Sequence, residues 1–535
     1  MSIYLIGILV SVAIYVAIGN YAGRKVKGLD DYYVAGRNAP TLLIVGTLVA
    51  SFLSTNAFMA ETGFAYEGYA FLMLALVAVN SMGYVVGALF FGRYVRRSQA
   101  LTIPEYFGKR FASRRVQCAA GLTTILGITA YLIAVTQGAA LLISEIGGLE
   151  YWQALLLVWL GYTLFTLYSG SEGVVLTDTL MFLVFTVVAF LGVWYLIDAT
   201  GGMQQTVAAL ATFEQRPGIL AWHGLEGDKA YWPSHASSLV WALILGVAWG
   251  GVVAVSPWQT SRYLMARSEH VVIRSACWSG LILMLLYIAL MLMGAAINLL
   301  NPAIDNPEKA VIWAAMNVMP GWLGTILIVG IMAAALSSCS TFLSLIGFSA
   351  TNDIVELKGS DAEKLRYSRL VMLAAGLVSL AIAFIKPSAI MWITYFAGTL
   401  FASSWGAVAF MSIWSKRITA SAAFWGIVVG FVANIIANFL RKFGVVSLPV
   451  YLDPFIIGSV LSLLTILLVS RAGTVSHTER SFLARIRQTP VEECDNAAVG
   501  GTLLVPRLMM ASGVLIAALL INYYAIPYSQ ALGQS

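Results

Sequence analysis

Apolar stretches of about 20 residues recur along this whole 535-residue chain, and they constrain its fold more than any other feature. A helix needs about 20 mostly apolar residues to cross the roughly 30 Å hydrocarbon core of a bilayer. Hydrophobic residues make up 60% of the chain and charged residues only 10%, whereas soluble domains carry roughly 25% charged residues. The sequence therefore predicts an all-α integral membrane protein. A membrane barrel is not expected, since its strands would appear as short segments of alternating hydrophobicity.

Hydropathy along the chain predicts about fourteen transmembrane helices. The first of them lacks the basic region and small-residue cleavage site of a secretory signal, so we expect it to remain as a helix. The expected spans are 3–19, 41–66, 68–92, 116–144, 151–168, 173–197, 236–256, 272–300, 321–350, 366–386, 388–414, 420–440, 452–470 and 506–526.

The basic residues gather in alternate loops between these spans. If the N-terminus lies outside, 25 of the 31 Lys and Arg residues fall in inner loops. Cytoplasmic loops carry such an excess, and one missed or invented span would invert every later loop. The pattern predicts an even number of spans in the cell membrane, with the N-terminus and the C-terminus outside. The outer basic residues are Arg216, Lys229, Lys309, Lys386, Arg441 and Lys442.

The remaining composition excludes several classes of function. The net charge of +6 belongs to loop ends that face anionic lipid, so no nucleic acid is expected as a partner. The four histidines lie in predicted loops, and no span carries the His, Cys or paired-carboxylate clusters that membrane hydrolysis or haem binding needs. Arg110 follows Gly108-Lys109 where a phosphate-binding loop needs Ser or Thr. We expect neither an enzyme nor a nucleotide-driven pump.

Two of the expected spans have features of interrupted helices. A lipid-facing helix could not satisfy the many polar residues of span 41–66, which predict unwound backbone or a cavity lining. Glycines 246, 250 and 251 around Trp249 permit a second break, in span 236–256. Interrupted helices at corresponding positions of two five-span units point to an inverted-repeat transporter with its site at the midplane.

Hydroxyl groups and one carboxylate are the candidate ion ligands. Ser337, Ser338, Ser340 and Thr341 lie in one apolar span, and 337, 340 and 341 share a helix face. Asp178 lies near the start of span 173–197, and we expect no basic partner for it in any span. Oxygen ligands suit a hard cation such as Na⁺, and an intramembrane carboxylate is read first as functional.

Each of these features also has a purely structural interpretation. A carboxylate near a helix N-terminus is stabilised by the helix dipole and can be reached by water. Serine and threonine in membrane helices often bond to the carbonyl four residues back or to a neighbouring helix. The residues by themselves leave both interpretations open.

Five short stretches together resemble the sodium:solute symporter family, over about residues 20 to 420. Each stretch is weak alone, and their order along the chain makes them specific. They are Asp31–Arg37, Ile103–Arg110, Gly173–Asp178, Pro257–Tyr263, and Ala334–Ser338 followed by Asn352–Ile354.

The resemblance implies a leucine-transporter-type core of two inverted five-helix repeats, 41–197 and 236–414. Residues 1–40 and 415–535 would be peripheral parts of one transporter domain spanning 1–535. It also implies a first Na⁺ site and a second one that shares Ser337. The first would use Ala50, Leu53, Ala334, Ser337 and Ser338, and the second Asp178, Ser337, Ser340 and Thr341.

The expected substrate-binding residues are Asn56, Ala57, Glu61 and Trp249. The family's sialic-acid branch resembles one with an arginine in the third core helix, which span 116–144 lacks; the sugar branch's polar pair is replaced by Asn56-Ala57. Trp249 stands eight residues before Pro257, like an aromatic residue of the proline and choline branches. It either holds a cationic or apolar ligand or packs between helices. Glu61 either meets an ammonium group or lines a wet vestibule.

The predicted function is Na⁺-driven import of a small organic solute by alternating access. One charge crossing 100 mV supplies about 2.3 kcal/mol, enough for a roughly 50-fold solute gradient, and a second ion squares that ratio. The alternatives are a membrane sensor, although no signalling domain follows, and a passive channel. The sequence names neither the solute nor the oligomeric state. Loop 198–235 either covers the outer mouth or is an ordered connection, and 471–505 is expected to be a solvated linker.

Overall fold

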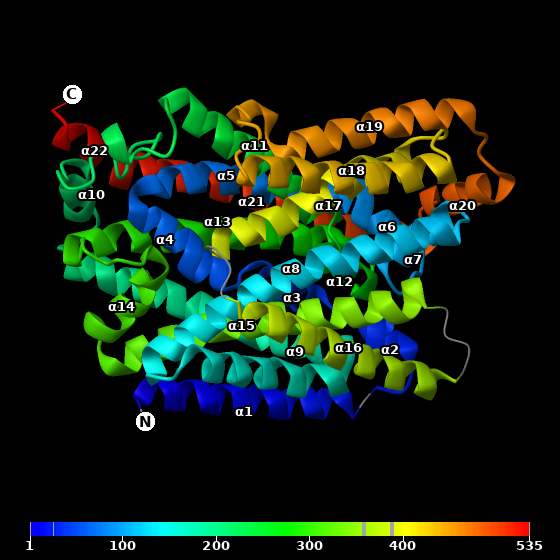
Figure 1. Ribbon diagram of the computed structural model, residues 1–535, viewed down its shortest axis with the longest axis horizontal. Helices are drawn as coiled ribbons and strands as arrows, with labels where there is room; N and C mark the ends of the chain where they lie inside the picture. The colour runs from blue at the N-terminus through cyan, green and yellow to red at the C-terminus, as the bar shows by residue number, and fades with distance from the viewer. Residues whose placement is uncertain (1, 25, 356–359, 386–389, 534–535) are drawn as a thin grey trace.

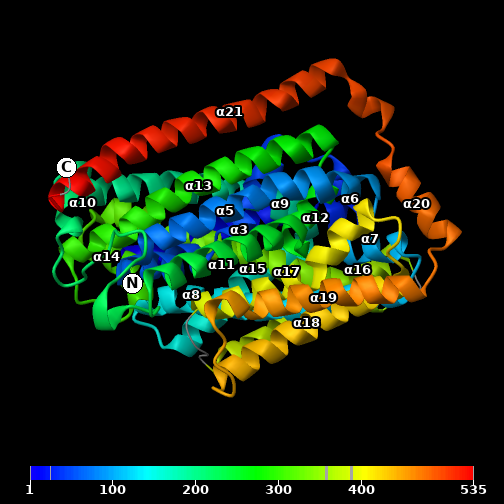
Figure 2. The same ribbon diagram turned by 90° about the horizontal axis from the view of Figure 1, so that it is seen from above.

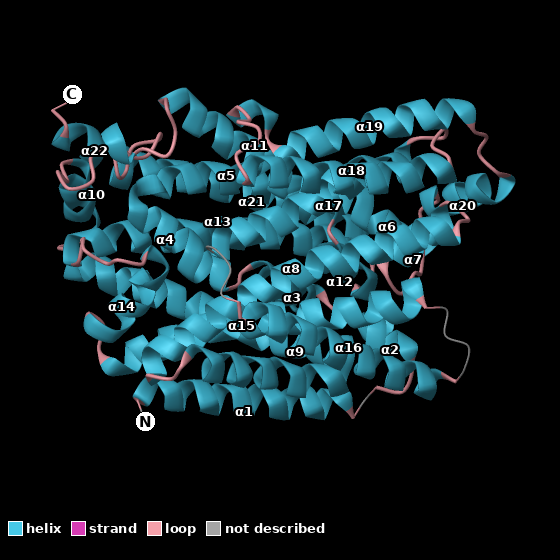
Figure 3. Cartoon of the chain, viewed as in Figure 1, coloured by secondary structure: helices cyan, strands magenta, loops and turns pink. Residues whose placement is uncertain are grey.

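The computed structural model describes residues 2–24, 26–355, 360–385 and 390–533. In these ranges the chain is a bundle of helices that run along its long axis, as Figures 1 and 3 show, with one isolated β-bridge between Ala39 and Ala266. The N-terminal and C-terminal ends lie at the same end of the bundle (Figures 1 and 2). The all-α prediction is confirmed. Lys25, Lys358 and Lys386, three of the loop cations, lie outside the described residues.

The α-helices within these ranges vary from short connecting turns to long membrane-length rods. They are α1 Ile3–Gly23, α2 Leu29–Val34, α3 Thr41–Phe52, α4 Thr62–Phe64, α5 Ala70–Gly87, α6 Arg93–Arg97, α7 Ile103–Arg110, α8 Arg114–Gly147, α9 Tyr151–Ala199, α10 Met203–Ala211, α11 His235–Val255, α12 Pro257–Met265, α13 Glu269–Leu300, α14 Ala310–Asn317, α15 Gly321–Phe348, α16 Asp361–Ala383, α17 Ile390–Trp414, α18 Ala420–Lys442, α19 Pro454–Ala472, α20 His477–Arg487, α21 Asn496–Leu520 and α22 Ile526–Ala531.

Short 3₁₀ and π-helical segments join or extend these helices. They are η1 Ala35–Arg37, η2 Asn56–Glu61, η3 Ala65–Tyr69, η4 Ala88–Gly92, η5 Gly227–Lys229, η6 Pro307–Lys309, η7 Ser349–Ile354, η8 Val450–Leu452, η9 Val491–Cys494 and η10 Ile521–Ala525.

Within the described ranges, twelve helices are long and apolar enough to cross a membrane. The predicted number of fourteen crossings is therefore not confirmed. Helix α3, with twelve residues, is too short to count by itself. The expected spans 151–168 and 173–197 both fall in α9, which changes direction at Gly170 (φ 54°, ψ −148°). Only glycine fits there, since a Cβ would lie 2.5 Å from a ring carbon of Tyr32.

The interruption predicted in span 41–66 is present. Helix α3 ends at Phe52, and Leu53 is extended (φ −75°, ψ 128°) before π-helical backbone begins at Asn56. Helix α8 approaches this break closely, since a Cβ on Gly138 would lie 2.4 Å from the hydroxyl of Thr55. A helix end leaves carbonyl groups without intrahelical donors, so the break exposes backbone oxygens inside the protein.

The second interruption lies elsewhere than expected. Helix α11 continues through the glycines around Trp249, and the chain breaks only at Ser256, which is extended (φ −63°, ψ 148°). The prediction of a break at Gly246 and Gly250-Gly251 was wrong. The break comes from Pro257, which disfavours helical backbone at the residue before it and begins α12.

The glycines of α11 serve close helix packing instead. A Cβ on Gly246 would lie 2.9 Å from the carbonyl oxygen of Leu76 in α5. From the other side, a Cβ on Gly83 in α5 would lie 2.3 Å from the carbonyl oxygen of Gly250. Small residues allow two membrane helices to approach backbone to backbone.

Helix α15 occupies the centre of the bundle. It packs against α9, α8 and α3, and its residues from Gly330 to Phe348 are buried. Helices α5, α11, α13 and α17 form the other side of the core. Helix α1 packs on α9 and α15, α18 and α19 pack on each other and on α17, and α21 lies along one edge beside α13 (Figure 2).

Candidate ion and solute sites

Residues of the expected first Na⁺ site meet where α3 ends against α15. The hydroxyl of Ser338 donates a hydrogen bond of 3.3 Å to the carbonyl oxygen of Leu53. Ala50, Ala334 and Ser337 are also buried, on the two packed helices that carry this contact. Oxygen atoms of a broken helix and of an intact one therefore face each other, an arrangement that suits a hard monovalent cation.

The carboxylate of Asp178, in the second half of α9, is fully buried and hydrogen-bonded. Ser337 of α15 donates to its Oδ1 over 2.6 Å, and Thr47 of α3 donates to its Oδ2 over 2.6 Å. Three helices of the core therefore converge on one carboxylate. Thr47 was not among the expected ligands. Its position in polar span 41–66 was the only signal for it.

Asp178 also has a basic partner, so the expectation that it has none was wrong. The guanidinium of Arg262 lies 3.6 Å from its Oδ2 and donates a hydrogen bond to the hydroxyl of Thr341. Arg262 falls outside span 236–256 in sequence and was counted with the inner-loop cations. The break at Ser256 turns α12 into the protein, and the side chain of Arg262 becomes buried.

The structure brings together only part of the expected second Na⁺ site. Asp178, Ser337 and Thr341 form one connected network through hydrogen bonds and Arg262. The hydroxyl of Ser340 instead donates to the carbonyl of Ser337 in its own helix, over 2.9 Å. This is the structural role that serine often takes in membrane helices.

A small cavity lies beside this network. Its volume is about 20 Å³, and its lining includes Ser261, Arg262, Thr341 and Ser344. A cavity needs about 10–15 Å³ to hold one water molecule. The cavity therefore has room for one water molecule next to Thr341.

The second buried carboxylate, Glu61 in η2, is held by neutral donors. Asn56 Nδ2 donates to Glu61 Oε1 over 2.8 Å. Tyr287 of α13 donates to Oε2 over 2.6 Å, and Tyr395 of α17 donates to Oε1 over 3.2 Å. The two tyrosines were missed, since nothing in an apolar span marks one tyrosine as facing a carboxylate.

Trp249 lies against this group of residues. Its ring centroid is 5.4 Å from that of Tyr395 and 5.8 Å from that of Phe52. It rests on Gly398 of α17, where a Cβ would lie 2.9 Å from the indole. Among the described residues, its indole nitrogen has no hydrogen-bond partner although it is buried. Asn56, Glu61 and Trp249 are thus brought together.

Ala57 lies in the same segment, η2, but contributes only backbone atoms to the candidate solute site. Its side chain is buried, and its carbonyl oxygen accepts a hydrogen bond of 2.7 Å from the hydroxyl of Thr62. The side chain carries no group that orients a ligand, so it can only shape the space next to Asn56.

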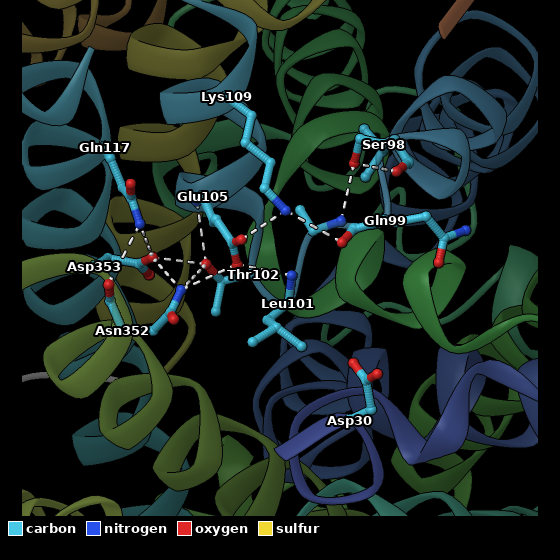
Figure 4. Close-up of polar contacts among 12 residues, drawn as sticks. Asp30, Ser98, Gln99, Leu101, Thr102, Glu105, Lys109, Gln117, Asn352 and Asp353 are labelled. Carbon is cyan, nitrogen blue, oxygen red and sulfur yellow. Dashed lines mark hydrogen bonds and ion pairs between the residues drawn. The ribbon is translucent and has the colours of Figure 1, made fainter. Parts of the chain in front are cut away.

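Two of the quoted sequence stretches meet at the end of the bundle opposite the termini (Figure 4). Thr102 donates to Asp353 Oδ1 over 2.7 Å, and Gln117 of α8 donates to the same oxygen over 3.0 Å. Asn352 donates to Glu105 of α7 over 3.2 Å. These contacts join α7, α8 and the end of α15, which closes this side of the bundle.

The comparisons with known proteins agree with this architecture. The family model "Sodium:solute symporter family" matches residues 32–430. The chain is 24% identical to a sodium/pantothenate symporter of Escherichia coli over 473 residues, which cover 85% of this chain and 94% of the relative. It is 25% identical to a sodium/proline symporter of Salmonella typhimurium over 487 residues, 87% of this chain and 93% of the relative.

The fold is similar to that of a solved membrane transporter. The structure of a Na⁺-coupled sialic acid symporter in a substrate-bound outward-open state superposes with a TM-score of 0.75 and 20% identity, covering 89% of this chain and 99% of that one. The likeness shows the leucine-transporter-type fold. Together with the family match over most of its length, it establishes that this chain belongs to the sodium:solute symporter family and is a Na⁺-coupled membrane transporter.

Proposed function

We propose that this chain imports a small organic solute that carries a positively charged amine or ammonium group, together with two Na⁺ ions. The observation that carries the proposal is the buried carboxylate of Glu61, which accepts hydrogen bonds only from neutral groups. None of the ion pairs among the described residues includes Glu61. A buried carboxylate is costly without a cation, and a cationic solute would supply one.

The aromatic side chains around Glu61 support the same class of solute. Trp249, Tyr287 and Tyr395 present large rings close to the carboxylate. Aromatic faces attract ammonium groups within about 6 Å, most strongly when the pair is desolvated. A substrate with an ammonium group would therefore be held by charge on one side and by rings on the other.

The negative charge of Glu61 distinguishes between the substrates in the relatives' names, pantothenate and proline. Pantothenate is an anion, and the fixed carboxylate of Glu61 at the proposed solute site opposes it. Proline carries an ammonium group beside its own carboxylate, which suits Glu61. The proposal therefore favours amino acids and betaines over carboxylates without an amine.

The first Na⁺ would bind between Ser338 and the end of α3. The Ser338 hydroxyl already faces the carbonyl of Leu53 at 3.3 Å, and a cation between them would replace that hydrogen bond. Ala50 and Ala334 would contribute carbonyl oxygens, and Ser337 its oxygen. Na⁺ binding would then tie the broken helix to α15, which couples the ion to the solute site beside Asn56.

The second Na⁺ would bind at Asp178, Ser337 and Thr341. In this structure Arg262 occupies the space between Asp178 and Thr341, so the ion and the guanidinium would compete for one carboxylate. Ser340 would join the ligands only if its hydroxyl left the carbonyl of Ser337. The cavity beside Thr341 has room for one water molecule, which would serve as a further ligand of the ion.

The orientation in the membrane follows from the basic residues. Helices α2, α6, α7 and α20 lie at the end of the bundle opposite the termini (Figure 1), and they belong to the Lys- and Arg-rich segments. Such segments face the cytoplasm. We therefore place both termini outside the cell membrane. The extended breaks at Leu53 and Ser256 support a division into repeats 41–197 and 236–414.

Purified protein in liposomes tests the function. A symporter shows saturable uptake that requires an imposed Na⁺ gradient, whereas a channel equilibrates the solute without one. A thermal-shift screen of amino acids, betaines, carboxylates and sugars, with and without Na⁺, identifies the solute class, because a bound ligand raises the unfolding temperature. Stabilisation by sugars or amine-free acids alone would contradict the proposed class.

A variant of Glu61 tests the role of its charge. Glu61→Gln keeps the size and planar shape of the side chain and removes the charge, so binding of an ammonium solute should weaken by at least about tenfold, while binding of Na⁺ changes little. Glu67→Gln, the same substitution six residues further on, should leave solute binding unchanged. Equal solute affinity in the wild type and Glu61→Gln would contradict the proposal.

A further inference from the structure

A cluster of metal-ligating side chains lies apart from the transport site, at the proposed outer end. His223 and Glu226 belong to the segment between α10 and α11, and His235 is the first residue of α11. The Nε2 atoms of His223 and His235 lie 3.5 Å and 3.9 Å from the same carboxylate oxygen of Glu226. The potential ligand atoms of these three residues all lie within 4.8 Å of one another.

The spacing of these atoms is close to that of a metal-bound set. Zinc takes imidazole nitrogen at about 2.0–2.1 Å and carboxylate oxygen at about 2.0–2.2 Å, which puts neighbouring ligand atoms about 3.3–3.5 Å apart in a tetrahedron. The His223–Glu226 distance already has this value. His235 is half exposed, so its ring is free to tilt and close the remaining gap.

The two imidazole rings lie face to face in this structure. They stack with centroids 3.7 Å apart and an angle of 12° between their planes. The indole of Trp222 meets the edge of both, at 5.1 Å from His223 and 6.2 Å from His235. His223 is largely buried, whereas Glu226 and His235 border a hollow of about 940 Å³. An imidazole binds a metal in the plane of its ring, so the exposed ring of His235 must turn out of this stack to bind the same ion as His223. The cluster is therefore accessible, and one of its rings has to reorient on metal binding.

We propose that His223, Glu226 and His235 bind one transition-metal ion of the zinc class, with water in the fourth position. Two imidazoles and a carboxylate suit Zn²⁺, whereas Na⁺, Mg²⁺ and Ca²⁺ prefer all-oxygen sites. The site is separate from the proposed Na⁺ and solute sites. Its occupancy does not depend on which solute is carried.

The position of the cluster indicates what a bound ion would do. The segment between His223 and Glu226 packs on the turn before α5, where a Cβ on Gly224 would lie 2.2 Å from the ring of Tyr69. Tyr231 donates its backbone N–H to the hydroxyl of Tyr69 over 2.9 Å. Tyr69 ends η3, which continues the broken helix that carries Glu61. The ion would therefore link this loop to α11 over the outer end of the broken helix. It would slow the movement of the loop away from that helix end.

Binding is measured on the full-length protein in detergent, without solute. Every variant carries Cys494→Ser, because Cys494 is an exposed thiol that could bind metal itself. Competition with a chromophoric chelator gives the Zn²⁺ affinity, and the visible absorption of Co²⁺ reports nitrogen coordination. We expect one Zn²⁺ per chain, and an affinity at least about tenfold lower in His235→Ala and in Glu226→Gln.

His477→Ala is the matched control, since His477 is also an exposed histidine at the start of a helix. It should leave both the affinity and the Co²⁺ spectrum unchanged. Equal Zn²⁺ affinity in the wild type and His235→Ala would overturn the site. The exposure of His235 makes a folding defect of that variant unexpected, and Glu226→Gln provides an independent check.

The restraint on the loop is tested by transport. Zn²⁺ should slow Na⁺-driven uptake of the identified solute by the wild type and by His477→Ala, and should have at least about tenfold less potency on His235→Ala. Tight Zn²⁺ binding without any effect on uptake would overturn the restraint. Because binding is measured without solute, a failed function proposal would not be mistaken for a failed metal site.

Discussion

At the scale of single residues, the buried carboxylates of Asp178 and Glu61 differ in how their charge is compensated. Asp178 has a guanidinium 3.6 Å away, from Arg262, as well as two hydroxyl donors. Glu61 has an amide and two phenols. A carboxylate with a built-in cation can exchange it for an ion, and one without a cation is ready for a charged ligand. This contrast assigns Asp178 to ion coupling and Glu61 to the solute.

Removing the hydroxyl of Ser338 should weaken the first Na⁺ site. A single neutral oxygen partner contributes about 1 kcal/mol, so Ser338→Ala should raise the Na⁺ concentration for half-maximal uptake roughly fivefold. Ser338→Thr keeps the hydroxyl and should be better tolerated. Ser462→Ala is the control, because the Ser462 hydroxyl of α19 donates to the carbonyl of Gly426 in α18, away from the proposed ion sites. Unchanged Na⁺ activation in Ser338→Ala would show that this hydroxyl binds no ion.

The charge pair of Asp178 and Arg262 provides a test of the number of ions. Breaking a buried pair by removing one partner costs about 3–5 kcal/mol, so Asp178→Asn alone should lower stability. The double variant Asp178→Asn/Arg262→Gln removes both charges and should restore much of that loss. The wild type should show a Na⁺ Hill coefficient above one, and the double variant a coefficient near one.

Charge movement per transported solute provides the second measurement of this prediction. The double variant should carry one positive charge fewer per solute than the wild type, as recorded by current and radiolabel uptake in the same liposomes. A wild type that moves one Na⁺ per solute would instead assign Asp178 and Arg262 a purely structural role.

At the scale of elements, glycine has two separate effects in the membrane helices. Gly250 of α11 does not interrupt its helix, since the chain stays helical to Val255 and breaks before Pro257. It allows the backbone of α5 to approach at Gly83. The helix break is produced by proline and the close contact by glycine, so the two residue types contribute to different properties of the repeat.

Substituting a glycine at this contact should destabilise the protein. Gly83→Ala places a Cβ 2.3 Å from the carbonyl oxygen of Gly250, and such overpacking costs about 1–3 kcal/mol. Gly513→Ala, in helix α21, meets no atom within 4 Å and should be neutral or slightly stabilising. Thermal unfolding in detergent compares the two. Equal unfolding temperatures would mean that α5 and α11 are free to separate at this position.

At the scale of the whole molecule, polar contacts join the helices at the end of the bundle opposite the termini, which is the inner end in the proposed orientation. Asp353 connects Thr102, Gln117 and the loop after α15 in one network. Cys118 of α8 is half exposed and donates to the carbonyl oxygen of Asp353 over 3.2 Å. A native thiol therefore lies at the seam between α8 and η7, which we expect to separate when the transporter opens inward.

Loosening this seam should make Cys118 more reactive. Asp353→Ala removes three hydrogen bonds, each contributing about 0.5–1.5 kcal/mol, so the open population should rise at least about tenfold. Labelling of Cys118 by a maleimide, in a Cys494→Ser background, should accelerate accordingly. Asp361→Ala, at an exposed acid of the same end, is the control. Equal labelling rates in both variants would contradict a closing role for Asp353.

The sequence by itself determined the membrane class, the all-α fold, the family and the break in span 41–66. These follow from local properties, since hydropathy, polar residues in an apolar span and short motifs are each read within one segment. The number of crossings was not settled in this way, because a helix that breaks after twelve residues and a bend inside α9 blur the boundaries between spans.

Tertiary structure alone decided which side chains meet. Arg262 pairs with Asp178, and two tyrosines donate to Glu61. Both arrangements depend on the rotation and depth of separate helices. The hydropathy of a segment does not depend on how its helix is rotated about its axis, so it does not indicate which polar side chains face each other. The break before Pro257 buried Arg262, a loop cation in the sequence, because it turned α12 inward.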